Sequence, residues 1–517
     1  FGSFDAIAER TRENLNQLFE SMTTLEAKPG TVEQKISDLY KMALDSTTRN
    51  ALGAQPIQPY IARIQAVKNH DGLAALLGEL NRYGEGGFFS FGVEADLTNS
   101  DMQVLYMGQG GLGMGDRDYY LKDENKELLS GYRNYLVKVL NLAGIENAEQ
   151  LAAQDIAVET ALAKVSWSRE QNRNMQAIYN PMSSEEIFSR WPGLRFDKIC
   201  EVAGVAPQEK VIVAQPSYFD ALSAMLGNAK LFDAHKAYLL CQFVSGQAGA
   251  LSDDFYTASW EFFSHQMAGT QEQQPRWKRA MSVPNGLLGE AVGEMYVNRY
   301  FPESSKKQML ALVENLRTAL GEHIDALEWM SDSTKVRARE KLAAFTVKIG
   351  YPDKWKDMTG LTIDPEKSYY ENVVACRMFW DKDEIKRKEM VNNADKKLIM
   401  LIDDEMSHLN VLGLMLEEDY MIVAFRNGRD AINYILEKNK PDLIICDLEM
   451  PIMTGEETAE EINEMTDFGI PIMFAADEND ERTIFACSEY KSRGYVLRPY
   501  NTTYIKTEVG KAFANYS

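Results

Sequence analysis

The sequence has few cysteines, and they do not pair at short spacing. Five occur, which is an odd number, and no C-x-x-C motif is present. They are widely separated along the chain, at Cys200, Cys241, Cys376, Cys446 and Cys487. A disulfide framework and a thiolate zinc site are therefore not indicated, and we interpret these residues as small buried apolar side chains.

Histidine is equally sparse. The chain has five in 517 residues, and no two lie within five positions of each other: His70, His235, His265, His323 and His408. Zinc hydrolysis of the His-Glu-x-x-His type needs two histidines one helical turn apart, a third ligand and a general base. We therefore expect no bound zinc and no peptidase activity from this chain alone.

Long apolar runs are also missing. The best candidate, Ala237–Leu251, is short and carries Gln242, Ser245 and Gln247, whereas a bilayer span needs roughly 20 apolar residues. We predict no membrane span. The chain begins at Phe1 without a basic and then apolar leader, so any targeting segment lies outside this sequence and the compartment stays open.

Positive charge is scarce relative to negative charge. The chain has 55 Lys and Arg against 77 Asp and Glu, a formal net charge of −22. Such a field repels phosphate backbones, so nucleic acid is not an expected partner. With 45% hydrophobic and 26% charged residues, the composition is that of a folded globular protein of several domains.

The first three quarters of the chain consist mainly of amphipathic segments. In Ser305–Met330, apolar residues recur every three or four positions, which predicts a helix that faces a core. These residues are Met309, Val313, Leu316, Leu320, Ile324, Leu327 and Met330. The same period is found in Thr11–Met22, Glu127–Ala143, Ala148–Trp167 and Tyr218–Leu226. We predict a mainly α region.

A charged run over Lys386–Lys397 resembles a linker and separates two predicted domains, residues 1–393 and 396–517. Beyond it, short apolar runs alternate with helical segments, which predicts a doubly wound, five-stranded parallel α/β sheet. The runs are Leu398–Ile402, Tyr420–Phe425, Leu443–Cys446, Ile470–Ala475 and Gly494–Leu497.

Three aspartates follow the predicted strands of this second region. Asp403 and Asp404 come directly after the first strand, and Asp447 comes after the third. Parallel strands of a doubly wound sheet bring these carboxylates to one edge. Two carboxylates about 4 Å apart repel by roughly 4 kcal/mol at an effective dielectric of 20, so the cluster favours Mg²⁺ or another hard cation. A single such Asp is more often a helix N-cap.

Two segments, Leu398–Asp404 and Pro441–Gly455, resemble the receiver domain of bacterial two-component response regulators. The resemblance implies a flavodoxin-like fold, a phosphoacceptor role for Asp447 and a bacterial origin. It also implies a Mg²⁺ site formed by Asp403, Asp404, Asp447 and the backbone carbonyl of Glu449. The chemistry is carboxylate attack on a phosphoryl group. The implied partner is a histidine kinase or a phosphotransfer protein.

Two positions depart from the receiver pattern. The Thr or Ser expected after the fourth strand is Ala476, and the Lys before the Pro of the fifth strand is Arg498, whose planar fork differs from an ammonium. Tyr495 matches the aromatic switch position. We expect phosphoryl acceptance, followed by a weak conformational switch.

Residues Gly108–Gly113 fit G-x-G-x-x-G after the possible strand Met102–Met107. In the dinucleotide-binding order, an apolar helix should follow such a motif, but Met114–Tyr120 carries charges there. We interpret the motif as a structural glycine turn.

An ordered series of segments resembles the non-catalytic N-terminal region of neprilysin-like zinc endopeptidases, up to about Lys388. The segments are Gly111–Leu121, Tyr179–Ser183, Arg276–Arg279, Leu288–Gly293, Trp329–Met330 with Thr334–Lys335, and Ile349–Trp355. The resemblance implies a helical lid around a cavity that admits peptides. The family's catalytic motifs are absent from this sequence. For Arg276–Arg279, contact with a peptide or acidic partner and bracing of acidic helices both stay open.

Three hypotheses remain. The first is phosphorelay signalling through Asp447. The second is a fragment of a secreted zinc endopeptidase that supplies peptide enclosure, joined artificially to the receiver. The third is that the two regions have no coordinated function and were joined by sequence engineering or in a broken gene. The receiver implies a cytoplasmic setting and the neprilysin-like region a periplasmic or secreted one, and the sequence does not choose.

Overall fold

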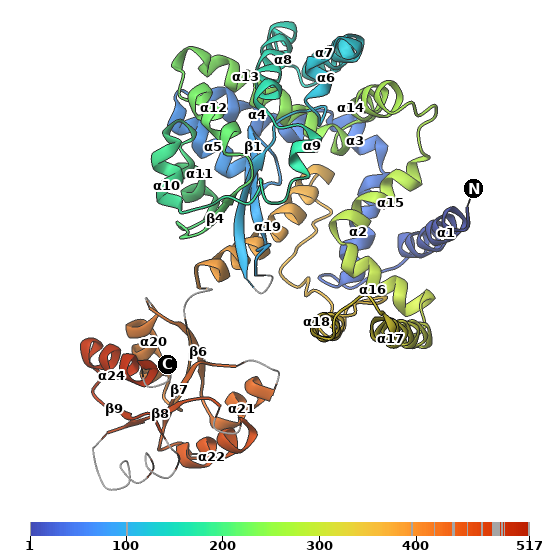
Figure 1. The fold of residues 1–517 in the computed structure, drawn as a ribbon. Helices are drawn as coiled ribbons and strands as arrows, with labels where there is room; N and C mark the ends of the chain where they lie inside the picture. Colours follow the sequence, from blue (N-terminus) through green and yellow to red (C-terminus); the bar gives the residue numbers. More distant parts are fainter. Residues whose placement is uncertain are drawn as a thin grey trace. The chain divides into compact units, whose positions relative to one another are not determined.

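The computed structural model of the chain consists of two compact units (Figure 1). The first comprises Phe1–Glu94 and Leu105–Lys386, and the second comprises Arg387–Ser517 together with Ala95–Val104. The described residues are 2–99, 102–393, 397–417, 419–436, 440–451, 453–466, 469–477, 486, 490 and 492–514. Cys200, Cys241, Cys376 and Cys446 are free and buried, and Cys487 lies outside the described residues. Each unit is treated separately below.

The first unit is built mainly of α-helices, as the sequence predicts (Figure 1). The helices are α1 (Ser3–Thr23), α2 (Val32–Leu44), α3 (Ser46–Leu52), α4 (Gln58–Ala66), α5 (His70–Arg82), α6 (Asp118–Leu121), α7 (Lys126–Leu142), α8 (Ala148–Val165), α9 (Arg169–Asn172), α10 (Ser184–Arg190), α11 (Phe196–Ala203), α12 (Pro216–Leu226), α13 (Phe232–Gln247), α14 (Asp253–Ser259), α15 (Arg276–Leu287), α16 (Gly289–Tyr300), α17 (Glu303–Ala326), α18 (Asp332–Ala343) and α19 (Tyr369–Asn393). The predicted amphipathic segments correspond to α1, α7, α8, α12 and α17.

A small sheet accompanies these helices, and the sequence reasoning anticipated only one of its strands. Its order is β1-β2-β4-β3, with β1 over Phe89–Ala95, β2 over Gln103–Gln109, β3 over Pro181–Met182 and β4 over Val211–Val213. Strands β2 and β4 pair in parallel, and β3 pairs antiparallel with β4. The short β3 and β4 give too few residues for a period-2 pattern to be visible in the sequence.

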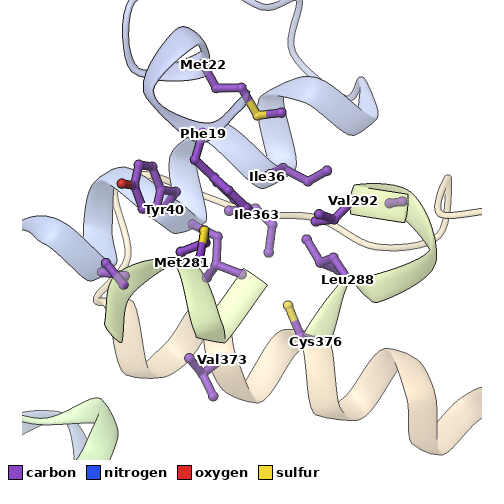
Figure 2. Packing of buried hydrophobic residues seen from close by; sticks show 14 of the residues in the cluster. Phe19, Met22, Ile36, Tyr40, Met281, Leu288, Val292, Ile363, Val373 and Cys376 are labelled. Carbon is purple, nitrogen blue, oxygen red and sulfur yellow. The ribbon is translucent and has the colours of Figure 1, made fainter. Parts of the chain in front are cut away.

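One hydrophobic core of the first unit joins segments far apart in the chain (Figure 2). Phe19 of α1 and Tyr40 of α2 contact each other with ring centroids 4.9 Å apart. Met281 of α15, Val292 of α16 and Cys376 of α19 belong to the same cluster. The apolar faces of these helices therefore cover one another, which is where most helical stability arises.

Helix α17 differs from its prediction in one respect. The segment is helical, but Met309, Leu316 and Leu320 are 43%, 61% and 50% exposed, so the expected core-facing position is wrong. Only Gly321 and Ile324 of α17 are buried, in the part of the helix that lies beside α18. The period of a sequence identifies an apolar stripe, but it does not show whether the same chain covers that stripe.

Part of the predicted linker is helical. Helix α19 continues to Asn393 and includes the charged run from Lys386 to Asn393. Lys, Arg, Glu and Met are strong helix formers, and the buried residues Tyr369 and Val373 anchor the start of the same helix. The remaining linker residues 394–396 lie outside the described part of the chain.

The second unit is a five-stranded parallel sheet of order β6-β5-β7-β8-β9, the flavodoxin-like arrangement that the sequence predicts. The strands are β5 (Leu398–Ile402), β6 (Met421–Phe425), β7 (Leu443–Asp447), β8 (Ile472–Ala476) and β9 (Tyr495–Leu497). The helices with described bounds are α20 (Met406–Leu416), α21 (Gly428–Leu436), α22 (Gly455–Thr466) and α24 (Thr502–Ala514).

Alternate residues of the central strands enter two separate cores. Met400 and Ile444 belong to one cluster, and Ile399 and Ile445 belong to the other. Both faces of the sheet are therefore covered, which explains why the strands read as continuous apolar runs. This burial fixes the register that aligns the carboxyl ends of β5 and β7.

The apolar segment Ala237–Leu251 lies largely in α13, where Leu239, Leu240 and Phe243 are buried inside the first unit. Among the helices of the described residues, none is both long enough and apolar enough to cross a bilayer.

Candidate functional site

The three aspartates predicted from the sequence meet at the carboxyl edge of the second unit's sheet. Asp403 follows β5, Asp447 ends β7, and the preceding residues Ile402 and Cys446 are register partners. One carboxylate oxygen from each of Asp403, Asp404 and Asp447 lies within 4.8 Å of the others. Asp403 and Asp447 are only 2% and 3% exposed. The edge of the sheet thus holds three acidic groups with little water around two of them.

Arg498, just beyond β9, spans this acidic cluster. Its Nη2 lies 2.5 Å from Oδ1 of Asp447, and its Nη1 lies 3.5 Å from Oδ2 of Asp403. Its Nε lies 2.9 Å from Oδ1 of Asp477, although the angle does not make a hydrogen bond. One guanidinium therefore faces several carboxylates, and the positive charge does not balance them.

Burial and charge both act on the acidic residues. Burial, together with the charge of Asp403, raises the pKa of Asp447 to about 6, although Arg498 acts in the opposite direction. Burial also raises the pKa of Asp403. These shifts show that the site resists carrying all its negative charge unless a further cation is present.

The donor set fits Mg²⁺. Three carboxylate groups offer hard oxygen ligands in a compact arrangement, and carboxylates are the ligands that Mg²⁺ prefers. Among the described residues, this is the one group of three or more His, Cys, Asp or Glu side chains arranged for a metal ion. Glu449 lies two residues beyond Asp447 with an exposed side chain, and its carbonyl ligand role stays a prediction.

The predicted switch positions lie near the same edge. Ala476 ends β8 and is 7% exposed, one residue beyond Ala475, whose register partner is Asp447. Its methyl group offers no hydroxyl for a phosphoryl oxygen. Tyr495 begins β9 and is half-buried. The switch roles of Ala476, Tyr495 and Arg498 stay predictions.

His408 belongs to this site, and the sequence reasoning missed it. Its Nδ1 lies 2.7 Å from Nη1 of Arg498 and 3.1 Å from Oδ2 of Asp403. Arginine only donates and an ionised carboxylate only accepts, so Nδ1 of His408 lies between a donor on Arg498 and acceptors on Asp403. The signal was the spacing from Asp403, since a residue in the first turn of the helix after β5 faces back toward that strand's end.

A second acidic pair lies inside the first unit, on α8. The Oε1 atom of Glu159 accepts hydrogen bonds from Tyr132 and Gln242, both at 2.9 Å, and its Oε2 accepts from Tyr120. Gln242 also donates to Oδ1 of Asp155 at 3.0 Å. Both carboxyl groups are fully buried. This pair is surrounded by neutral donors and contacts no cationic side chain among the described residues.

The G-x-G-x-x-G motif contributes a backbone hydrogen bond to Glu159 of this pair. The backbone N–H of Gly113 donates to Oε2 of Glu159 at 2.5 Å, and a Cβ on Gly113 would lie 1.9 Å from the Tyr132 hydroxyl. Gly111 has a φ of 79°, in the left-handed region that glycine favours. These glycines thus form a structural turn, as the sequence predicts.

Comparison with known proteins follows the same division. Residues 1–352 match Peptidase family M13. The chain belongs to that family. Residues 399–509 match the response regulator receiver domain, so the second unit is a receiver domain joined to an M13 region.

Similar proteins include full-length peptidases. The neutral endopeptidase of Lactobacillus helveticus is 33% identical over 339 residues, which cover 65% of this chain and 52% of that protein. Human endothelin-converting enzyme 1 is 29% identical over 368 residues, which cover 68% of this chain and 47% of the enzyme. The chain thus spans about half the length of these relatives.

A solved structure supports the fold of the M13 region. The zinc metalloprotease Zmp1 of Mycobacterium tuberculosis, in its open state, aligns with a TM-score of 0.70 and 28% identity. The alignment covers 75% of this chain and 60% of that chain. The helical first unit of the present chain is therefore similar in fold to part of an M13 peptidase.

Proposed function

We propose that the receiver domain accepts a phosphoryl group on Asp447 from a histidine kinase or a phosphotransfer protein. The observation that carries this proposal is the convergence of the Asp403, Asp404 and Asp447 carboxylate oxygens within 4.8 Å at the open edge of a flavodoxin-like sheet. Few structural roles explain three carboxylates at one edge that Arg498 compensates only in part, because their repulsion lowers stability.

In the proposed reaction, a carboxylate oxygen of Asp447 attacks the phosphorus atom of a phosphohistidine. The new P–O bond forms as the P–N bond breaks, and the departing imidazole takes up a proton. Arg498 already lies 2.5 Å from Asp447, so its guanidinium is placed to pair with the added phosphoryl oxygens. His408 holds the other arm of Arg498.

Asp403, Asp404 and Asp447, with the Glu449 carbonyl, are the groups that would hold Mg²⁺. When bound, this ion neutralises charge on the phosphoryl oxygens. The chain itself supplies a buried nucleophile, Asp447, and a guanidinium held beside it by Asp447 and Asp403.

The test is incubation of the full chain with acetyl phosphate and MgCl₂, followed by mass spectrometry of the acyl phosphate. We expect a single modification that maps to Asp447 and is lost in Asp447→Asn and after chelation. Asp419→Asn is the matched control, because Asp419 lies in the same unit and pairs with Lys506 instead. Modification that persists in Asp447→Asn would overturn the proposal.

A second candidate function concerns the M13 region, and the exposed stripe of α17 favours it. We propose that this region encloses peptides without hydrolysing them, and that another polypeptide with the missing part of the M13 fold covers Leu312, Leu316 and Leu320. These three leucines are 48%, 61% and 50% exposed on one helix, whereas large apolar patches on a monomer usually mark contact surfaces.

Two measurements test this second candidate. The chain alone should hold no stoichiometric zinc and should leave a quenched fluorescent peptide intact, and chelator-sensitive cleavage would contradict this. The chain should co-purify with the part of the Lactobacillus helveticus neutral endopeptidase that its match leaves uncovered. Leu316→Glu should abolish co-purification, whereas Leu414→Glu, at a leucine of the receiver domain that is 70% exposed, should not.

A further inference from the structure

Three arginines of the first unit line one cavity of about 260 Å³. Arg276 and Arg279 come from the start of α15, and Arg49 comes from α3. The remaining wall is apolar or aromatic over much of its area, and includes Ala43, Tyr256, Ala280, Val283 and Tyr369. Neither proposed function uses this cavity, although the sequence singles out the basic segment Arg276–Arg279.

Two of the three arginines are satisfied by fixed partners. The Nη2 atom of Arg276 lies 2.6 and 2.7 Å from the two carboxylate oxygens of Asp253. Arg49 donates to the backbone carbonyls of Leu251, Ala43 and Gly249 at 2.6, 3.0 and 3.3 Å. Carbonyls satisfy donors but carry no negative charge, so only Arg276 has a counter-ion of its own.

Arg279 is the arginine with donors to spare. Its guanidinium carbon lies 4.2 Å from the ring centroid of Tyr256, which fixes the plane of the group and leaves its edges available. Its Nε is buried without a hydrogen-bond partner, and it has no ion-pair partner within the described part of the chain. A buried donor without a partner carries a desolvation cost that an anionic ligand would remove.

The charges around the cavity also favour an anionic ligand. Burial lowers the pKa of Arg49, Tyr369 and Asp253 act in the opposite direction, and the positive charges of Arg276 and Arg279 lower it further. These groups therefore repel one another across the cavity, in a chain whose net charge is −22. The excess of positive charge is therefore local to this cavity and does not reflect the composition of the whole chain.

We infer that this cavity binds a small oxyanion, either a phosphate or a carboxylate, and that Arg279 is the residue that donates to it. A volume of about 260 Å³ corresponds to roughly eight water molecules, which gives room for a tetrahedral anion or a small dicarboxylate. Phosphate and carboxylate both match the fork of a guanidinium, with two parallel N–H donors. The site is independent of phosphoryl acceptance at Asp447.

The experiment is calorimetric titration of the full chain with sodium phosphate, and separately with disodium succinate. Ionic strength is held constant with NaCl, and EDTA keeps divalent cations from the receiver domain. We expect one saturable site for at least one of the two anions. Saturation by phosphate alone assigns a phosphoryl ligand, and saturation by succinate alone assigns a carboxylate.

Variants locate the site. Arg279→Gln should weaken the affinity about tenfold or more, because it removes a charge-assisted donor pair. Ser282→Asp, which places a negative charge at an exposed position of the same cavity wall, should abolish binding. Lys307→Gln removes one positive charge from an exposed pair with Glu303 on α17 and should bind as the natural chain does.

The outcomes separate this inference from the receiver. Binding that survives in Arg498→Gln, is weakened in Arg279→Gln and is lost in Ser282→Asp supports it. Binding lost in Arg498→Gln and kept in Arg279→Gln would place the anion at the receiver and overturn the inference. An absence of saturable heat for both anions would also overturn it, and circular dichroism of each variant excludes loss of folding as the cause.

Discussion

Two acidic clusters within the described residues are built in opposite ways. In the M13 region, Asp155 and Glu159 are buried among neutral donors, four of which converge on Glu159. In the receiver domain, the Arg498 guanidinium pairs with Asp403 and Asp447 at the edge of a sheet, and Asp404 lies beside them.

The difference separates a structural cluster from a functional one. Neutral donors stabilise the Glu159 carboxylate in place and leave few of its lone pairs for a ligand. Burial and the charge of Glu159 raise the pKa of Asp155 well above its usual range. A carboxylate whose lone pairs are satisfied by neutral donors needs no cation, whereas three carboxylates at one sheet edge gain from one.

The largest expected effect is on the stability of the M13 region and follows from removal of Glu159. Glu159→Ala leaves the Tyr120 and Tyr132 hydroxyls without the carboxylate that accepts from them, so we expect the M13 region to lose about 3 to 5 kcal/mol. Urea denaturation followed by tryptophan fluorescence measures this region alone, because all seven tryptophans precede residue 386.

Glu322→Ala, at an exposed position of α17, is the control and should change stability by less than about 0.5 kcal/mol. If Glu159→Ala costs no more than this control, the network does not stabilise the region and the contrast with the receiver fails.

The next effect should appear only in the receiver domain. Mg²⁺ at 100 times its dissociation constant adds about 2.7 kcal/mol to the state that binds it, so MgCl₂ should raise the melting temperature of this unit. The tryptophan-detected melting of the M13 region should not change. Differential scanning calorimetry with fluorescence detection in parallel resolves the two units.

Asp404→Asn should remove the gain from Mg²⁺, and Asp419→Asn should keep it. A gain that is the same in both units, or one that survives in Asp404→Asn, would mean that the ion acts elsewhere.

A smaller effect concerns the pH dependence of the M13 region. Because the folded-state pKa of Asp155 is raised, its contribution to stability is present below the unfolded pKa of about 3.9 and is lost as the pH rises through the folded pKa. Asp155→Asn keeps the neutral shape, so its stability relative to the natural chain should increase with pH, by at most about 1.4 kcal/mol per pH unit.

Urea titrations by tryptophan fluorescence from pH 5 to pH 8 measure this difference. Glu149→Gln, at an exposed residue of α8 that pairs with Arg133, is the control and should run parallel to the natural chain. Parallel profiles for Asp155→Asn as well would show that Asp155 is charged in the folded state.

The two clusters also show what a sequence can predict. The receiver's acids follow apolar runs that become β5 and β7, so strand order alone brings Asp403 and Asp447 to one edge. The M13 cluster joins Gly113, Tyr132 and Gln242, which no local period relates, so it emerges only from tertiary packing.

The same reasoning explains the errors. The stripe of α17 was visible in the sequence, but the absence of a cover over Leu316 depends on the rest of the fold. The helical continuation of α19 was hidden because charged residues suit both linkers and exposed helices. His408 was overlooked because its partner Arg498 lies 90 residues further along the chain.

The smallest expected effect concerns the coupling between Asp447 and Tyr495 inside the receiver domain. Beryllofluoride with Mg²⁺ mimics the phosphoryl group on Asp447, and we expect only small amide shifts in the natural chain because Ala476 cannot donate a hydrogen bond. Ala476→Thr adds a hydroxyl at the end of β8 and should enlarge the shifts near Tyr495, with a net gain of about 1 kcal/mol from the new bond. Ala476→Val introduces a side chain of nearly the same shape as threonine but without the hydroxyl, so it should behave as the natural chain does. Equal shifts in all three proteins, recorded by amide NMR, would show that this position does not couple Asp447 to Tyr495.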